Sequence, residues 1–253
     1  MITYKHLGKM GKLGNCLFQI ATTESHAIKM NTTSGYPLWI YQKYFEYKLH
    51  VANEFPTRDY YEPDDFSYRP IPMVDDINLC GYFQSYKYFE DNKSHILKIF
   101  RVNNEIEERI SRGFKFIEDT ETCSIHVRRG DYLNMPEYHP FLGIEYYKNA
   151  IDLFDNNMLF VVFSDDINWC KENFGKINRR FVYIDYNNQP IELHIMKLCK
   201  NHIIANSSFS WWGAYLCENH NQTVIAPKKW FGVAYNKYTT KDLLPPLWRQ
   251  IDV

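Results

Sequence analysis

The chain has 253 residues, 45% of them hydrophobic and 23% charged, which is enough for one large or two small globular domains with their own cores. Lys and Arg together number 29 and Asp and Glu number 30, so the net charge is -1. This balance excludes an electrostatic attraction of the whole chain to nucleic acid or to an anionic membrane. Any phosphate chemistry must therefore come from a local cationic site.

The six cysteines are widely spread, with no C-x-x-C pair and no metal-ligand spacing. Four of them lie in apolar or helical patterns that are typical of buried free thiols, which indicates a reducing compartment. The N-terminus lacks a signal-peptide core, and no apolar run approaches membrane length. We expect a cytoplasmic protein with no transmembrane segment and no nucleic-acid partner.

The first part of the chain opens with a strand-like stretch at residues 2–7 and a glycine-rich turn at residues 8–14. Asn15 is the expected N-cap of the helix that follows, because an Asn side chain can accept a bond from the free N–H groups of a first turn. The remaining expectations are a strand at 36–41, an irregular segment over 42–76 with four prolines, a strand at 77–83, and amphipathic stretches near 86–100 and 103–112.

The second part alternates short apolar runs with helical patterns, which predicts βαβ units and a parallel sheet. We place a domain boundary near residue 118, giving an N-terminal domain 1–118 and a C-terminal domain 119–253. The expected strands are 123–128, 159–163, 181–184, 202–205 and 223–226, and the expected helices are 144–154, 167–174, 191–199 and 209–218.

Three polar clusters follow predicted strands, at residues 128–131, 164–166 and 206–210. Parallel sheets bind ligands beyond the carboxyl ends of their strands, so one crevice would gather these clusters. Arg128 and Arg129 are planar donors that suit a diphosphate, and the free N–H groups at a helix start form an anion site. Each cluster taken alone is also explained by a helix cap, a turn or a surface arginine pair.

Residues 126–132 read H-V-R-R-G-D-Y and resemble the H-x-R-R-x-D motif of the fucosyltransferase superfamily. Four further segments are similar to the α-1,2-fucosyltransferase family, glycosyltransferase family 11. They read G-K-L-G-N at 11–15, G-Y-F-Q-S-Y-K-Y-F at 81–89, F-S-D-D at 163–166 and N-S-S-F-S-W-W-G-A-Y-L at 206–216. The resemblance runs in order from about residue 8 to residue 230.

The resemblance implies two Rossmann-like domains of the GT-B type, with a reduced N-terminal domain on the acceptor side and a C-terminal domain that binds the GDP-sugar. It implies GDP-L-fucose as donor, a galactose-containing oligosaccharide as acceptor, and inverting transfer to the 2-hydroxyl of a β-galactoside. It also implies that no metal or other cofactor is needed. The adjacent acids at 165–166 agree with this, because they are not the spaced D-x-D of metal-dependent transferases.

The resemblance also assigns roles. Arg128 binds the leaving diphosphate, where fixed cations stabilise the charge that develops in the transition state. His126 lies at the nucleoside, and Asp165 accepts from the guanine N–H edge. Asp131 is the candidate base and His126 the second; a salt bridge from Asp131 that orients Arg129 is an equal alternative. The implied donor-binding set is Gly14, Asn15, His126, Arg128, Arg129, Asp165, Asn206, Ser207, Ser208 and Phe209.

One departure from the family stands at Cys16, where relatives usually have Gln. Trp211 and Trp212 are expected in the core. Tyr132 and His139 could shape an acceptor cleft, but packing or a surface position is the favoured explanation for each. Two other functions stay open. One is a transferase of the same fold with another sugar or acceptor hydroxyl, and the other is a non-catalytic glycan- or nucleotide-binding protein.

Overall fold

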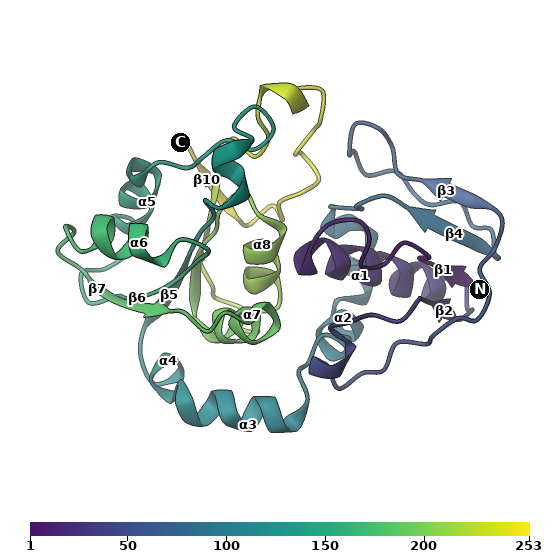
Figure 1. Ribbon diagram of the computed structural model, residues 1–253, viewed down its shortest axis with the longest axis horizontal. Helices are drawn as coiled ribbons and strands as arrows, with labels where there is room; N and C mark the ends of the chain where they lie inside the picture. Colours follow the sequence, from purple (N-terminus) through teal and green to yellow (C-terminus); the bar gives the residue numbers. More distant parts are fainter. The chain divides into compact units, whose positions relative to one another are not determined.

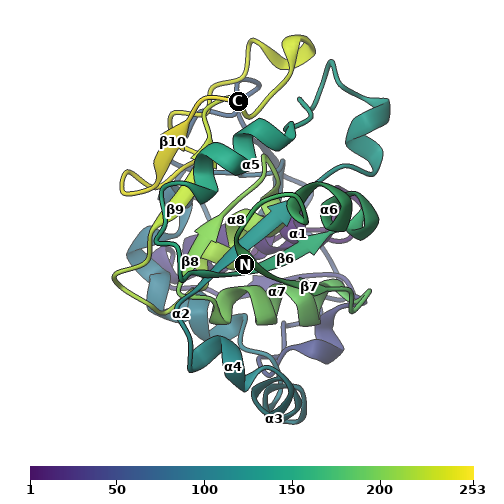
Figure 2. The ribbon, with the colours of Figure 1, turned by 90° about the vertical axis from the view of Figure 1, so that its left-hand side faces the viewer.

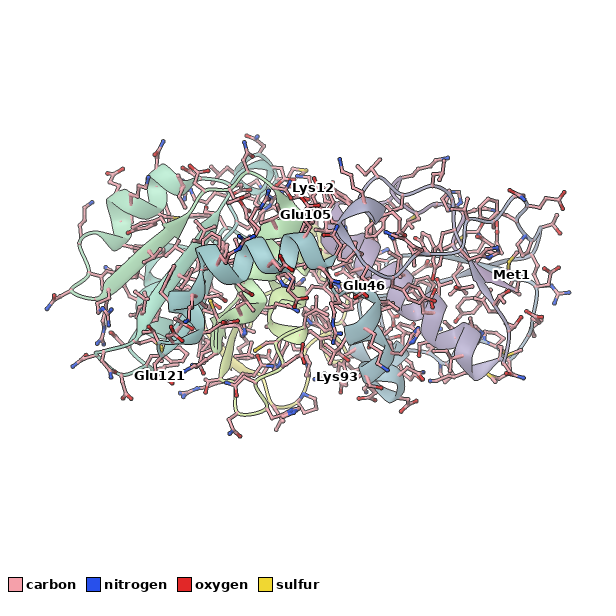
Figure 3. All side chains as sticks on the ribbon, turned by 90° about the horizontal axis from the view of Figure 1, so that it is seen from below. Met1, Lys12, Glu46, Lys93, Glu105 and Glu121 are labelled. Atoms are coloured by element: carbon pink, nitrogen blue, oxygen red, sulfur yellow. The ribbon has the colours of Figure 1, made fainter.

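The computed structural model describes all 253 residues, which form two compact units. The first unit comprises Met1–Glu107 and Lys237–Pro245, and the second comprises Glu108–Asn236 and Pro246–Val253. The division falls within helix α3 (Asn104–Gly113), whose first turn carries the acidic side chain of Glu105 (Figure 3). Each unit is built around one parallel sheet, and none of the helices has the length and apolar character needed to cross a membrane.

The first unit has a four-stranded sheet in the order β2-β1-β4-β3, with every neighbouring pair parallel (Figure 1). β1 and β4 are neighbours in the sheet but far apart in the sequence, so the carboxyl ends of these central strands bring distant segments together. The strands are short: β1 (Ile2–Thr3), β2 (Ser34–Gly35), β3 (Asp59–Tyr61) and β4 (Ile77–Cys80).

Two of the strands expected in this unit differ from the structure: one is shorter than expected, and the other does not form. Residues 2–7 do not continue as a strand beyond Thr3, because the Lys5 N–H bonds to the Asn78 side chain at 2.8 Å and the chain then turns. Residues 36–41 form no strand. Their apolar alternation places Leu38 and Ile40 in solvent, 84% and 75% exposed, and only Tyr36 makes an isolated bridge.

The glycine-rich turn leads into α1 (Leu13–Lys29), which is buried along almost its whole length. Lys12 holds the N-cap position, and its side chain makes no capping hydrogen bond. The expectation that Asn15 caps this helix was therefore wrong. Asn15 lies in the first turn, and its Oδ1 accepts a hydrogen bond from Gln84 at 2.8 Å. The other helices of this unit are α2 (Lys93–Ile99) and the 3₁₀ helices η1 (Gln42–Tyr44), η2 (Tyr86–Tyr88) and η3 (Glu90–Asn92).

The second unit has a six-stranded parallel sheet in the order β10-β9-β8-β5-β6-β7. The chain runs outward from β5 to β7, returns to β8 beside β5, and runs outward again on the other side. The topological switch point therefore lies between β5 and β8, where open α/β sheets bind ligands. The strands are β5 (Thr122–Val127), β6 (Leu159–Ser164), β7 (Arg180–Ile184), β8 (Asn201–Ile203), β9 (Val224–Pro227) and β10 (Arg249–Ile251).

Helices cover both faces of this sheet (Figure 2). Alternate residues of β5, including Cys123, Ile125 and Val127, pack with buried aromatic and aliphatic side chains of α5 and α6. The opposite face is covered by α7 (Figure 2), and both faces of β5 and β6 are therefore buried. The helices are α4 (Lys115–Glu118), α5 (Ile144–Ile151), α6 (Ile167–Phe174), α7 (Gln189–Leu198) and α8 (Ser208–Tyr215), with η4 (Asp131–Asn134) and η5 (Val233–Tyr235).

Every strand and helix expected in the second unit is present, and no end differs from the expected position by more than three residues. The expectations missed β3, which lies inside the proline-interrupted segment, and β10 near the C-terminus. All six cysteines are free and buried, whereas the sequence indicated this for four of them. Trp211 and Trp212 are fully buried core residues, as expected.

Candidate functional site

Strand β5 delivers the H-x-R-R-x-D segment to the carboxyl edge of the second sheet, beside the switch point. The chain turns at Gly130, whose backbone leaves the usual helix and strand regions before η4 begins. A β-carbon at Gly130 would lie 2.6 Å from Oδ2 of Asp165. Glycine therefore lets the segment after β5 approach the segment after β6 closely enough for side chains of the two to pair.

The Arg128 guanidinium is mostly buried and pairs with two carboxylates. One terminal nitrogen lies 2.5 Å from Oδ1 of Asp131, and the other lies 2.6 Å from Oδ2 of Asp165. Its central carbon lies 5.4 Å from the centre of the Tyr132 ring. These contacts fix the side chain, and they occupy the donors that a diphosphate would use.

Arg129 is held by different partners. Its Nε donates to Oδ2 of Asp166 at 2.9 Å, and its backbone N–H donates to Oδ1 of Asp165 at 2.8 Å. The guanidinium carbon lies 4.3 Å from the Trp169 ring centre and 4.7 Å from that of Phe141. Arg129 is thus a packed side chain that ties the end of β5 to the start of α6.

Asp131 is predicted either as a base or as a cap or salt-bridge partner that orients Arg129. The structure pairs Asp131 with Arg128, and it pairs the Arg129 side chain with Asp166. Hydrogen bonding to Arg129, ahead of all other causes, holds the pKa of Asp166 below its usual range. The two guanidinium groups meet three carboxylates, and the site is therefore less cationic than its sequence indicates.

His126 is buried, and its ring centre lies 5.3 Å from that of Phe209. Its backbone carbonyl accepts from the Tyr147 hydroxyl at 3.2 Å, whereas its ring Nδ1 has no hydrogen-bond partner. Burial, with a smaller effect from the Arg128 charge, lowers the pKa of His126 to about 3. The imidazole is neutral at physiological pH and a weak base, and its free Nδ1 can bind a ligand polar group.

The segment after β8 faces the same switch point. Asn206 donates from Nδ2 to the carbonyls of Pro140 and Trp230, both at 3.1 Å, while its buried Oδ1 lacks a partner. Ser207 is the N-cap of α8, and its hydroxyl accepts from the Phe209 N–H at 3.4 Å. This is the helix start that the sequence predicted, with first-turn N–H groups available for an anion.

The structure joins most of the predicted donor residues in the second unit. Arg128, Arg129, Asp131 and Asp165 form one hydrogen-bonded cluster. The Tyr132 hydroxyl links this cluster to the segment after β8 by donating to the Asn206 carbonyl at 3.0 Å. Gly14 and Asn15 belong to α1 in the first unit and form no part of this cluster.

Sequence reasoning missed the two rings that hold Arg129, Phe141 and Trp169. Trp169 follows the Asp166 cap of α6 by three residues, and this i,i+3 spacing was the one available signal. Cys16, where the family pattern usually has Gln, is buried in the first turns of α1. Burial raises the pKa of this thiol, so Cys16 is a packing residue of the first turn.

Metal ligation has no counterpart in the side-chain arrangement, because no three His, Cys, Asp or Glu residues are grouped so that they could hold an ion. The donors gathered at the switch point are guanidinium, hydroxyl and amide groups, which suit phosphate oxygens.

A sequence model of the family described as Glycosyl transferase family 11 matches residues 38–251. The chain is 30% identical to the alpha-1,2-colitosyltransferase of Escherichia coli, over 96% of this chain and 97% of the relative. It is 34% identical to the O-antigen biosynthesis glycosyltransferase WbnK of Escherichia coli, over 60% and 55% of the two chains. It is 28% identical to the galactoside 2-alpha-L-fucosyltransferase SEC1 of Bos taurus, over 81% and 62%.

Solved structures share the fold at low sequence identity. The fucosyltransferase NodZ from Bradyrhizobium aligns with a TM-score of 0.58 and 12% identity, over 84% of this chain and 91% of NodZ. A mutant of FUT1 from Arabidopsis thaliana, solved in complex with GDP, aligns with a TM-score of 0.59 and 11% identity, over 96% and 74%. The expected GT-B-like α/β fold with two parallel sheets, the first of them small, is confirmed.

Proposed function

Since the chain belongs to glycosyl transferase family 11, we propose that it transfers L-fucose from GDP-L-fucose to the 2-hydroxyl of a β-galactoside, with inversion and without a metal. The observation that carries this proposal is the position of Arg128 and of the α8 N-terminus on either side of the β5/β8 switch point. A nucleoside diphosphate needs such an arrangement of fixed cations and backbone N–H groups.

The chemistry follows from charge. As the bond between the sugar and the diphosphate breaks, negative charge grows on the leaving phosphate, and donors that are already oriented stabilise it without reorganisation. Arg128 is oriented before the donor arrives, by Asp131 and Asp165. On our proposal the diphosphate displaces these carboxylates in part, which frees Asp165 to accept from the guanine and leaves Asp131 facing the reacting sugar.

The proposed donor site includes His126, Arg129, Asn206, Ser207, Ser208 and Phe209 besides these residues. The unpartnered atoms Nδ1 of His126 and Oδ1 of Asn206 support this, because a buried polar atom without a partner gains most from a ligand that supplies one. We also propose that Gly14 and Asn15 contact the donor. On our proposal residues 1–118, joined by the returning stretch Lys237–Pro245, serve the acceptor, and the rest of 119–253 serves the donor.

Asp131 is the better of the two proposed bases. His126 is buried against Phe209, whereas a base must reach the acceptor hydroxyl. Asp131 is more exposed and is released when Arg128 turns to the diphosphate. A weak base suffices when the bond to the leaving group is largely broken before the acceptor attacks.

A second candidate is transfer of colitose, because a relative that aligns over almost the whole chain is an alpha-1,2-colitosyltransferase. The two activities share the linkage and a GDP-linked donor and differ in the sugar transferred. They are separated by supplying GDP-L-fucose and the GDP derivative of colitose in parallel, each with lactose, and identifying which sugar is transferred.

The donor claim is tested by comparing the melting temperature with GDP, UDP and ADP, since a ligand that binds only the folded state raises it. We expect a rise with GDP alone, and transfer that is unchanged by EDTA. Equal shifts with the three nucleotides, or no shift with GDP, would refute GDP-sugar binding. Loss of transfer in EDTA with recovery on adding a divalent cation would refute metal independence.

A further inference from the structure

The first unit contains a pocket of about 470 Å³ that none of the roles above uses. We call it the first-unit pocket. Its lining comes from the segments that follow β1, β3 and β4, so it opens at the carboxyl edge of the small sheet, where parallel sheets bind ligands. One carboxyl group and four aromatic rings are among the side chains that line it: Glu62, Tyr61, Phe66, Tyr82 and Tyr238.

Glu62 is the central polar group of this pocket. Its Oε2 accepts from the Tyr82 N–H at 2.6 Å, and the backbone N–H groups of Phe83 and Gln84 also bond to the carboxyl group. Burial outweighs these bonds and raises the pKa of Glu62 to about 7. A carboxyl group held in this way is fixed in place, and near neutral pH it can both accept and donate hydrogen bonds.

Backbone strain is concentrated around the same pocket. Phe66 (φ 56°) and Phe83 (φ 51°) are the two positive-φ residues of the chain that are not Gly, Asn or Asp. Gly81 has φ 151°, and a β-carbon there would lie 2.3 Å from Cβ of Glu62. Such conformations cluster at ligand sites, where the surrounding structure holds them. Here Phe66 and Gly81 line the pocket, and the residue after Gly81 donates its N–H to Glu62.

An aromatic wall faces this carboxyl group. The ring centres of Phe66 and Tyr238 lie 4.3 Å apart, and the Tyr82 ring stands edge-on to Phe66 at 6.0 Å. Aromatic faces present flat apolar surface to a ligand, and the tyrosine hydroxyls add polar groups at the edge. The charged groups of the pocket are of both signs, with Asp64 beside Glu62 and Lys237 on the other segment, which fits an uncharged ligand rich in hydroxyl groups.

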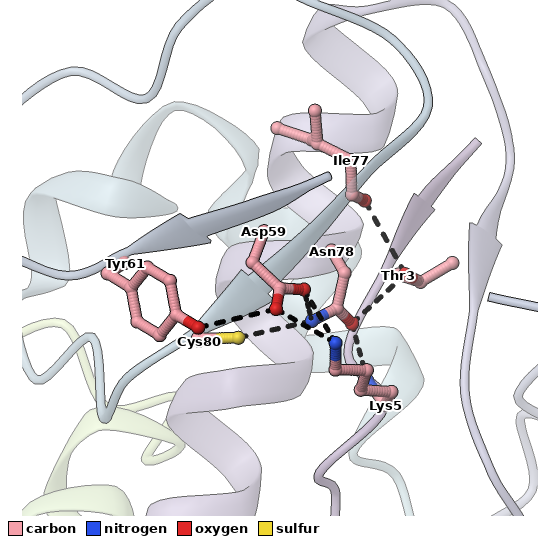
Figure 4. Close-up of polar contacts among 7 residues, drawn as sticks. All are labelled: Thr3, Lys5, Asp59, Tyr61, Ile77, Asn78 and Cys80. Carbon is pink, nitrogen blue, oxygen red and sulfur yellow. Dashed lines mark hydrogen bonds and ion pairs between the residues drawn. The ribbon is translucent and has the colours of Figure 1, made fainter. Parts of the chain in front are cut away.

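A polar network holds the strand ends that carry the pocket (Figure 4). Asp59 accepts from Lys5 at 2.7 Å and from the Asn78 side-chain amide at 2.9 Å, and the Tyr61 hydroxyl donates to it at 3.3 Å. The same amide lies 3.1 Å from the sulfur of Cys80. Tyr61 and Cys80 both line the pocket, so its edge is positioned by bonds across three strands.

We propose that the first-unit pocket binds a sugar ring of the acceptor saccharide, with Glu62 bonding to its hydroxyl groups and Phe66 and Tyr238 packing against its apolar face. This inference rests on the function proposed above. A nucleotide phosphate is disfavoured in this place, because the buried charged group that faces the ligand is a carboxyl group. Glu62 and Tyr238 would then determine affinity for the acceptor without affecting affinity for GDP.

The test is a titration of the full chain with lactose in the presence of saturating GDP. Lactose binding is monitored by saturation-transfer NMR. We expect Glu62→Gln and Tyr238→Ala each to weaken lactose binding by about tenfold or more, since a ligand loses a hydrogen bond to a charged group or an aromatic contact. Matched controls are Glu54→Gln, an exposed carboxylate of the same unit, and Tyr186→Ala, an exposed tyrosine of the second unit. Both controls should bind lactose as the parent chain does.

GDP affinity is measured separately for the parent chain and for each variant, in samples to which no GDP has yet been added. This measurement separates the two proposals. Absence of GDP binding by the parent chain counts against the donor site, and the pocket proposal falls with it. GDP binding without lactose binding overturns the pocket proposal alone. Unchanged lactose affinity in both pocket variants, or loss of GDP affinity in Glu62→Gln, also overturns it. Glu62→Gln preserves the shape of the side chain, and Tyr238 lies on another segment of the chain. If one variant fails to fold, lactose binding by the other still tests the proposal.

Discussion

Arg128 shows how much of a binding site a single side chain can organise. Its two carboxylate partners come from the segment after β5 and the segment after β6, and its ring neighbour Tyr132 reaches the segment after β8. The arginine therefore links three of the segments around the switch point. Removing it affects both the proposed leaving-group contact and the orientation of the two carboxylates.

We predict that Arg128→Ala lowers the transfer rate by about 10²–10³, because a donor aimed at developing charge is lost. The melting temperature should change little, since Asp131 and Asp165 are partly exposed and can be hydrated. The matched control is Arg112→Ala on the exposed side of α3. Near-normal transfer by the Arg128 variant would remove this residue from the mechanism.

Glu62 predicts a pH dependence of stability. Its pKa is raised from 4.5 to about 7 in the folded chain, so between these values the folded state holds more protons than the unfolded state. Its contribution to stability is present below about pH 4.5 and is lost as the pH rises through 7. We expect Glu62→Gln to gain stability relative to the parent chain between pH 5 and pH 8, measured by thermal unfolding. A difference that is constant or shrinks over this range would contradict the buried carboxyl group.

For single residues, the sequence predicts which side chains belong to the site better than it predicts which of them contact each other. The close spacing of Arg128 and Asp131 makes their contact available from the sequence. The contact between Arg128 and Asp165 spans two strand ends and depends on how close Gly130 lets them come, which only the folded chain reveals. The low basicity of His126 was missed for the same reason, because its burial depends on Phe209 and the rest of α8.

The helices and strands of the second unit can be predicted closely from the sequence, whereas the strands of the first unit cannot. β5 and β6 are continuous apolar runs buried on both faces, and the helices between strands have clear amphipathic patterns. Strands of two or three residues, such as β2 and β3, leave too little pattern to recognise. The strands expected at 2–7 and 77–83 are present only as the shorter β1 and β4. Their pairing is supported by side chains such as Asn78, which bonds to the backbone of a neighbouring strand segment.

The packing of α7 on α8 gives a prediction for an element. A β-carbon at Gly213 would lie 2.2 Å from Sδ of the fully buried Met196. We expect Gly213→Ala to destabilise the fold by about 1–3 kcal/mol through overpacking. Met196→Ala also destabilises the fold, but it makes room for the added methyl group, so the loss in the double variant should be smaller than the sum of the two single losses. Additive losses, measured in urea, would show that the two residues are not in contact.

At the scale of the whole molecule, the most unusual feature is a first unit made from two separate stretches of chain. Residues 237–245 return to it, and Asp242 fastens them there. The buried Asp242 carboxylate accepts from the Tyr68 N–H at 3.1 Å and pairs with Lys87 at 2.6 Å, and its carbonyl accepts from Ser85 at 2.7 Å. This return could not be predicted from the sequence, because a single carboxylate in a polar stretch has no distinctive pattern.

We predict that Asp242→Ala destabilises the first unit by about 2–4 kcal/mol, because a buried N–H and an ammonium group lose their partner. Hydrogen exchange should show faster exchange at Tyr68 and in the segment 81–89, while β5 and β6 stay protected. A matched control is Asp252→Ala, whose partner Lys228 is well exposed. Equal protection in the two variants would contradict a fastening role for Asp242.

The split first unit has a consequence for synthesis of the chain. A ribosome makes the strands and α1 of the first unit early, but Tyr238 and Asp242 follow only after the second unit has been made as far as Asn236. The aromatic wall and the Asp242 bonds therefore form late, whatever the order in which the sheets fold. A chain released before residue 237 has the donor-side residues and lacks part of the first-unit pocket. We expect such a fragment to hold GDP more readily than acceptor sugar.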